Sequence, residues 1–140
     1  MKFIKLPLTL VLFFLVPQLQ AQSNSELDLS GTWQVQLAPY PKLEKSEGSI
    51  NLPGSLAQSK FGFKTEGADI GVLTPTYKYI GVASYSREFE IPKSWKNKSI
   101  TLFLERVLWQ SEVWIDGKPI GKKDALGIPH IHEVGNIKPG

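Results

Sequence analysis

The sequence predicts an all-β fold, an antiparallel β-sandwich of the jelly-roll (galactose-binding-like) class. Two observations support this prediction. Several short segments alternate apolar and polar residues, and Gly, Pro or Asx turn signals separate them. No stretch has a helical periodicity long enough to predict a helix. Many short strands with such turn spacing favour a sandwich or jelly roll over a parallel α/β sheet.

The first 21 residues are predicted to be a secretory signal peptide, not part of the fold. Lys2 and Lys5 precede an apolar run from Leu6 to Val16, and the small residue Ala21 follows in a polar stretch. The apolar run is too short to cross a bilayer, which takes about 20 residues. We expect cleavage near Ala21, a short polar leader at 22–28, and a periplasmic or secreted protein with no membrane association after cleavage.

The mature chain is predicted to be nearly neutral. Removing the signal peptide takes away two of the 16 Lys and Arg residues and none of the 13 Asp and Glu residues, so the formal charge becomes +1. Lys and Arg do not cluster, and we therefore expect neither nucleic acid nor acidic lipid as a partner. The absence of cysteine excludes disulfides, thiolate metal sites and a cysteine nucleophile.

The N-terminal half is predicted to contain two strands and a long connection. TWQVQL (32–37) alternates apolar and Gln or Thr residues, which is typical of a half-buried strand. SINLPGS (49–55) predicts a brief strand that Pro53-Gly54 stops. Residues 54–79 then form a long connection that holds aromatic residues. Structureless connections of this length in a compact domain are usually functional or mobile.

Three consecutive segments then alternate with period two, and we expect them to form an antiparallel sheet with one face in a core. In the third segment, Ser111, Val113 and Ile115 share one face. PKSWKNK (92–98) predicts a turn or a single helical turn between the first two. Asp116-Gly117 predicts a hairpin, because the turn that matches strand twist needs positive φ, which Gly adopts easily. The three segments are SYSREFEI (84–91), SITLFLE (99–105) and SEVWID (111–116).

Four sequence motifs follow one another in the second half of the chain. They are the Y-x-R-x-F strand (Tyr85, Arg87, Phe89), the W-K-x-K turn (Trp95, Lys96, Lys98), the V-W-[IV]-[DN]-G-x-x-[IV]-G hairpin (Val113 to Gly121) and the Pro129-His130 pair. In this order they resemble the N-terminal sugar-binding domain of glycoside hydrolase family 2, the family of β-galactosidases, β-glucuronidases and β-mannosidases. The resemblance covers nearly all of residues 28–140.

The resemblance implies a jelly-roll domain followed by an immunoglobulin-like sandwich and a TIM barrel that carries two catalytic glutamates. We therefore expect residues 29–140 to be an incomplete sugar-binding domain that lacks its last strand or strands, without catalytic residues and without a cofactor. Ser84 stands where relatives usually have Trp, and Tyr79-Ile80-Gly81 stands where some β-galactosidases have Asn. These departures leave the substrate sugar open.

The predicted function is that of a sugar-binding domain in an exported enzyme that hydrolyses O-glycosidic bonds. The alternatives are a free-standing carbohydrate-binding module and a non-catalytic interaction domain. The candidate substrate-binding residues are Tyr79 at the end of the long connection, Trp109 in a turn before a strand, and His130. Exposed aromatic rings can stack on the C–H faces of sugars, although rings at strand ends also pack sandwich rims or neighbouring domains.

Two groups of residues suggest chemistry of their own. A retaining glycosidase needs two carboxyl groups about 5 to 5.5 Å apart, and on neighbouring strands only Glu105 and Glu112 meet that distance. Arg106 favours surface ion pairing instead. His130 and His132 point the same way in a strand and can reach one metal ion, but the sequence offers no obvious third ligand. We expect no metal site, with His130 buried and hydrogen-bonded and His132 exposed.

Overall fold

A computed structural model describes residues 26–39, 43–67 and 73–140. In these ranges the chain forms antiparallel β-strands and one short 3-10 turn, without an α-helix, which confirms the predicted all-β antiparallel class. Nor do these residues include a helix with the length and apolar character needed to cross a membrane.

The chain divides into two units, residues 1–30 and residues 31–140. In the first unit the structure describes residues 26–30, where the Asp28 carboxylate accepts hydrogen bonds of 2.8 Å from the backbone N–H and the hydroxyl of Ser30. The predicted signal peptide and the start of the predicted leader lie outside the described residues.

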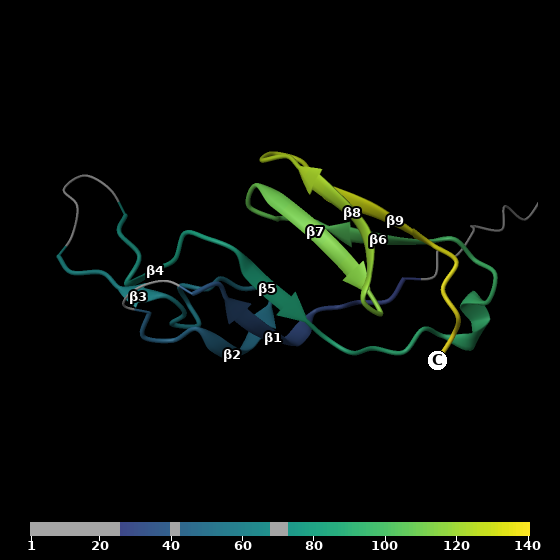
Figure 1. The fold of residues 1–140 in the computed structure, drawn as a ribbon, viewed down its shortest axis with the longest axis horizontal. Coiled ribbons are helices and arrows are strands. Elements are labelled where there is room, and N and C mark those ends of the chain that lie inside the picture. Colours follow the sequence, from purple (N-terminus) through teal and green to yellow (C-terminus); the bar gives the residue numbers. More distant parts are fainter. Residues whose placement is uncertain (1–25, 40–42, 68–72) are drawn as a thin grey trace, which may run out of the picture. The chain divides into compact units, whose positions relative to one another are not determined.

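The described part of the second unit contains short strands in separate sheets (Figure 1). The sheet orders are β2-β1-β5, β3-β4, β6-β9 and β7-β8, and every pairing is antiparallel. The elements are β1 (Gly31–Leu37), β2 (Glu47–Leu52), β3 (Phe63–Lys64), β4 (Tyr77–Lys78), β5 (Ala83–Ser86), the 3-10 turn η1 (Lys93–Trp95), β6 (Ile100–Leu104), β7 (Gln110–Ile115), β8 (Lys118–Asp124) and β9 (His130–Gly135).

The hydrophobic core lies on one face of the β2-β1-β5 sheet. Alternation along β1 buries Val35 and Leu37, and Ile50 of β2 is buried beside them. Phe61 completes the cluster and has no exposed surface. The ammonium of Lys45 lies 3.8 Å from the centre of its ring, which is a cation–π contact. Both predicted N-terminal strands are therefore confirmed.

The connection 54–79 contains more structure than the sequence predicts. Its Phe61 enters the core, and β3 and β4 pair within it. Gly62 makes this path possible, because its φ is +106° and a Cβ there would collide with the backbone carbonyl of Lys78. Burial of one aromatic side chain thus orders a segment that lacks periodicity. Residues 68–72 of this connection lie outside the described ranges.

The three period-two segments do not form one sheet, so that part of the prediction is wrong. The first forms only the short strand β5, which ends at Ser86 and pairs with β1. The second forms β6, which pairs with β9, and the third forms β7, which pairs with β8. Alternation predicts a half-buried strand but carries no information on its partner.

The predicted hairpin is confirmed between β7 and β8. Ile115 pairs with Lys118, so the loop consists of two residues, and both have positive φ: Asp116 at 50° and Gly117 at 73°. Positive φ at both central residues defines the type I′ turn. The predicted single turn before β6 is also found, as η1.

Candidate functional site

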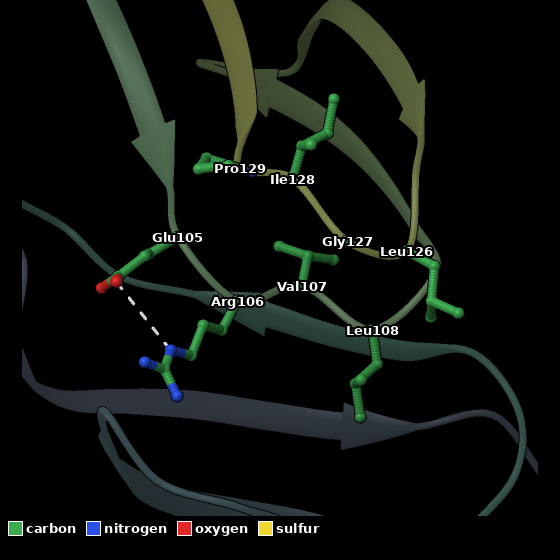
Figure 2. A pocket seen from close by; sticks show the side chains of 8 residues that line it. All are labelled: Glu105, Arg106, Val107, Leu108, Leu126, Gly127, Ile128 and Pro129. Carbon is green, nitrogen blue, oxygen red and sulfur yellow. Dashed lines mark ion pairs between the residues drawn. The ribbon is translucent and has the colours of Figure 1, made fainter.

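Two loops lie side by side at the ends of the C-terminal strands (Figure 2). Residues 105–109 connect β6 to β7, and residues 125–129 connect β8 to β9. The backbone N–H of Ala125 donates a hydrogen bond of 3.0 Å to the carbonyl of Trp109 and joins the loops. Residues 105–108 and 126–129 line an open pocket of about 380 Å³, which we call the tip pocket.

The loops around the tip pocket expose large apolar side chains. Leu108 and Trp109 of the first loop, and Leu126 and Ile128 of the second, are all at least 66% exposed. Apolar side chains that gather on the surface of a soluble protein mark a site of contact with a ligand or partner. The tip pocket with Trp109 is therefore the candidate binding site.

Trp109 is held in an unusual backbone conformation. Its φ is +80°, and the N–H of Gln110 donates a hydrogen bond of 3.3 Å across it to the carbonyl of Leu108. This arrangement is a γ-turn with positive φ, which is rare and strained in L-residues. Such strain costs of the order of 1–3 kcal/mol and persists only where surrounding contacts hold it. The turn carries a ring that is 69% exposed.

The charged residues of the first loop pair with each other. Arg106 Nε lies 3.8 Å from Glu105 Oε1, and both side chains are largely exposed (Figure 2). The expected surface ion pair is thus confirmed, and exposed pairs of this kind contribute little to stability. Glu112 lies opposite Lys122 in the β7–β8 ladder. The idea that Glu105 and Glu112 approach each other on neighbouring strands is wrong, because β6 and β7 are not paired.

A buried hydrogen-bonded cluster connects β7, β9 and the second loop. The hydroxyl oxygen of Ser111 lies 2.8 Å from His130 Nδ1 and 2.8 Å from His132 Nε2. His130 Nε2 lies 2.9 Å from the carbonyl oxygen of Ala125. The two histidines are only 1% and 2% exposed. The expectation for His130 is confirmed, but the predicted exposure of His132 is wrong, since both residues lie on the same inward face of β9.

The hydrogen bonds determine where the protons of this cluster lie. A backbone carbonyl only accepts, so His130 Nε2 carries a proton. When His130 is neutral, its Nδ1 then accepts from the Ser111 hydroxyl. The Ser111 oxygen in turn accepts from His132 Nε2. Burial lowers the pKa of His132, and the positive charge of Lys123, together with that of His130 in its protonated form, lowers it further.

The three predicted substrate-binding residues occupy different settings. Trp109 directly follows Leu108, which lines the tip pocket, and His130 is linked to the same pair of loops through its bond to Ala125. With 1% of its surface exposed, His130 has almost no surface to offer a ligand. Tyr79 packs against the core of the N-terminal sheet, and its hydroxyl donates a hydrogen bond of 2.8 Å to the carbonyl of Val82. The structure therefore joins Trp109 and His130, and holds Tyr79 elsewhere.

The sequence interpretation missed Ser111 and the aliphatic residues of the second loop. A signal for Ser111 was present, because alternation places it on the inward face with Val113 and Ile115. A polar side chain on such a face needs a buried hydrogen-bond partner. Leu126 and Ile128 lie in a loop without periodicity, and nothing local indicates that they are exposed.

A second depression lies on the outer face of the N-terminal sheet, with a volume of about 540 Å³. Gln34, Gln36, Ser84 and Ser86 line it with amides and hydroxyls, but no aromatic ring does. Its lining offers hydrogen bonds without a stacking surface, so the tip pocket is the stronger candidate. Among the residues that the structure describes, no three His, Cys, Asp or Glu side chains are placed to hold a metal ion.

Models of known protein families give no match to this chain, and a search of curated proteins gives none either.

Proposed function

We propose that this chain is the carbohydrate-binding jelly-roll domain of an exported glycoside hydrolase similar to family 2. Hydrolysis of the O-glycosidic bond would then take place on a catalytic barrel outside residues 1–140. The observation that carries the proposal is Trp109, an exposed ring held on a strained turn beside an open pocket.

The chemistry of the tip pocket suits a neutral sugar. An indole face stacks on the C–H groups of a pyranose, and amphipathic rings of this kind supply a large contact area. Glu105 and Arg106 add an acceptor and a donor for sugar hydroxyls at the edge of the same pocket. The volume of about 380 Å³ lies within the usual range for small-molecule sites.

The remaining parts of the proposal rest on the sequence. The order of the four motifs supports the family assignment, and the all-β antiparallel structure is compatible with a jelly roll. The charge order and apolar run of residues 1–21 support export to the periplasm or the exterior.

Replacing Trp109 with alanine is expected to weaken sugar binding at least tenfold. Loss of one stacked ring removes about 1.4 kcal/mol, which is a factor of ten in the dissociation constant. Binding is measured by NMR titration with methyl β-galactoside, β-glucuronide and β-mannoside. Trp114→Ala is the matched control, because Trp114 is also exposed, at 54%, but lies within β7, whereas Trp109 directly follows the lining residue Leu108. An equal loss in both variants, or no binding by the unmodified protein, contradicts the proposed site.

The hydrolase part of the proposal is tested by the DNA that follows the codon for Gly140. A second sandwich and a barrel with two glutamates would support it. An immediate stop codon, without a barrel gene nearby, would contradict it and favour a free-standing carbohydrate-binding module.

A non-catalytic interaction domain is the second candidate function, favoured by the exposed Leu108, Leu126 and Ile128. Three aliphatic side chains offer more apolar surface than a single sugar ring needs. If they contact a protein, Leu126→Ser will leave sugar titrations unchanged and reduce the association of the chain with that partner or with itself, measured by sedimentation. If they contact only sugar, the same variant will weaken sugar binding without changing the sedimentation profile.

A further inference from the structure

A continuous series of hydrogen bonds links the buried histidines to the exposed Trp109. His132 donates to Ser111, and Ser111 donates to His130. His130 donates to the carbonyl of Ala125, whose backbone N–H donates to the carbonyl of Trp109. Each donor–acceptor distance is between 2.8 and 3.0 Å.

We propose that the His130–Ser111–His132 cluster is an acid-sensitive positioning device, which holds the Trp109 loop in its binding geometry and releases it on mild acidification. The cluster touches no ligand and acts only through the two loops. The choice of sugar as the ligand rests on the proposed function, whereas the release of the loop does not.

The cluster is suited to two neutral imidazole rings. The single hydroxyl between them donates its one proton to one ring and accepts a hydrogen bond from the other. A second proton on His130 would sit on Nδ1 and turn that atom from an acceptor into a donor. The hydroxyl of Ser111 would then have to accept from both rings and redirect its own proton. A second proton on His132 would sit on Nδ1, which faces Gly121 of β8. Protonation of His130 therefore breaks its bond from Ser111 and releases one edge of the ring that holds Ala125. Protonation of His132 keeps its Nε2–H bond to Ser111 but places a buried charge beside Gly121.

The charges around His132 do not favour its protonated form. Strand β8 contributes Lys123, which lies opposite Ser111 in the β7–β8 ladder. Strand β6 contributes no ionisable side chain, since residues 100–104 are ITLFL. On β7 and β9, alternation turns Glu112 and Glu133 to the faces opposite Ser111 and the histidines. Of the charged side chains on these four strands, Lys123 shares the face of Ser111, and its charge is positive.

The direction of the pH effect follows from the lowered pKa of His132. In the unfolded chain this histidine binds a proton below about pH 6.5, whereas His132 in the folded protein resists it. The stability that neutral His132 contributes is therefore complete above about pH 6.5 and is lost as the pH falls toward its folded pKa. His130 and His132 are the two histidines of the whole sequence, so an imidazole NMR signal comes from the cluster alone.

The loop that carries Trp109 is suited to change its conformation when the histidine cluster is disturbed. Its γ-turn is strained, and a strained turn relaxes when a contact that restrains it is lost. The bond from Ala125 to Trp109 is one such contact, and Ala125 is itself held by His130. Disturbance of the imidazoles thus reaches the exposed ring through only two further hydrogen bonds.

The test follows both histidines and Trp109 by NMR in the ¹⁵N-labelled chain without ligand. At pH 7.5 we expect His130 to be protonated on Nε2 and unprotonated on Nδ1. Between pH 7.5 and 5.5, the indole resonance of Trp109 and the amide of Ala125 should shift with the same midpoint as the imidazoles. The indole of Trp114 should not move. Titration of the imidazoles with unchanged Trp109 and Ala125 resonances would overturn the proposal.

Two variants separate positioning from a general effect on folding. Gln at position 132 keeps an N–H near Nε2 but does not titrate, so His132→Gln should reduce or abolish the shift of Trp109 at pH 5.5. Ser111→Ala removes the bridge and should give the acidic position of the Trp109 resonance already at pH 7.5. If Ser111→Ala does not fold, the Trp109 shift measured in His132→Gln tests the proposal by itself. An unreduced Trp109 shift in His132→Gln would contradict the proposal.

A further experiment measures the binding of methyl β-galactoside to the unmodified protein at both pH values. We expect at least tenfold weaker binding at pH 5.5 than at pH 7.5. Equal binding at both values would overturn the acid-sensitive control of the site. If the sugar binds at neither pH while Trp109 still follows the imidazoles, the proposed function fails and the positioning device stands.

Discussion

Phe61→Ala is expected to lower the free energy of unfolding by about 3 to 5 kcal/mol, a large share of the total stability of a small domain. Phe61 is completely buried and packs with Val35, Leu37 and Ile50 in the core cluster. Truncating the side chain to alanine leaves a cavity between the sheet and the connection that follows β2. Water does not solvate this cavity well, so the lost packing contacts are not replaced. The change should also release the pairing of β3 with β4.

Urea unfolding followed by circular dichroism measures this loss. Phe103→Ala is the matched control, since Phe103 is 57% exposed on β6 and should change stability by no more than about 1 kcal/mol. If the two alanine variants were equally stable, the core would not be centred on Phe61.

Gly62→Ala is expected to destabilise the protein by about 2 to 4 kcal/mol, from backbone strain together with a steric collision. The φ of Gly62 is +106°, and a Cβ at this position would meet the carbonyl of Lys78. Both segments are backbone, so neither can move aside by rotating a side chain. The bridge that pairs Lys45 with Gly62 should weaken as well.

Gly67→Ala separates the cost of backbone strain from the cost of the steric collision. Gly67 also has positive φ, at +75°, but a Cβ there would meet nothing within 4 Å. Its loss should be about 1 kcal/mol, the ordinary cost of a left-handed L-residue. Thermal unfolding of both variants gives the comparison. Equal losses would show that the close approach to Lys78 is unimportant.

Local features of the fold could be predicted from the sequence, but the pairing of the strands could not. The alternation of β1, β6 and β7 and the Asp116-Gly117 turn depend on neighbouring residues, and the structure contains all of them. The partner of β6 is β9, which comes after an intervening hairpin. Such a choice depends on packing between distant segments, which a periodicity of two does not encode.

The candidate site was likewise predictable from the sequence only in part. Trp109 could be identified as an aromatic residue in a turn before a strand, and its exposure agrees with that interpretation. The burial of His132 follows from strand alternation, because it shares a face with the buried His130. Its hydrogen-bond partner could not be predicted, because the hydroxyl of Ser111 comes from β7. The role of Ala125 was equally hidden, since only its backbone takes part.

The nesting of the β7–β8 hairpin between β6 and β9 implies an order of assembly. A hairpin with a two-residue turn forms within about 1–10 μs, whereas joining distant strands first requires closing a long loop. Once β7 and β8 have paired, the segment between β6 and β9 is effectively shortened, and the entropy of closing it falls. Slower refolding with unchanged unfolding in a Gly117 variant is the signature of this order. The two-residue turn would then set how quickly the buried histidine cluster is built.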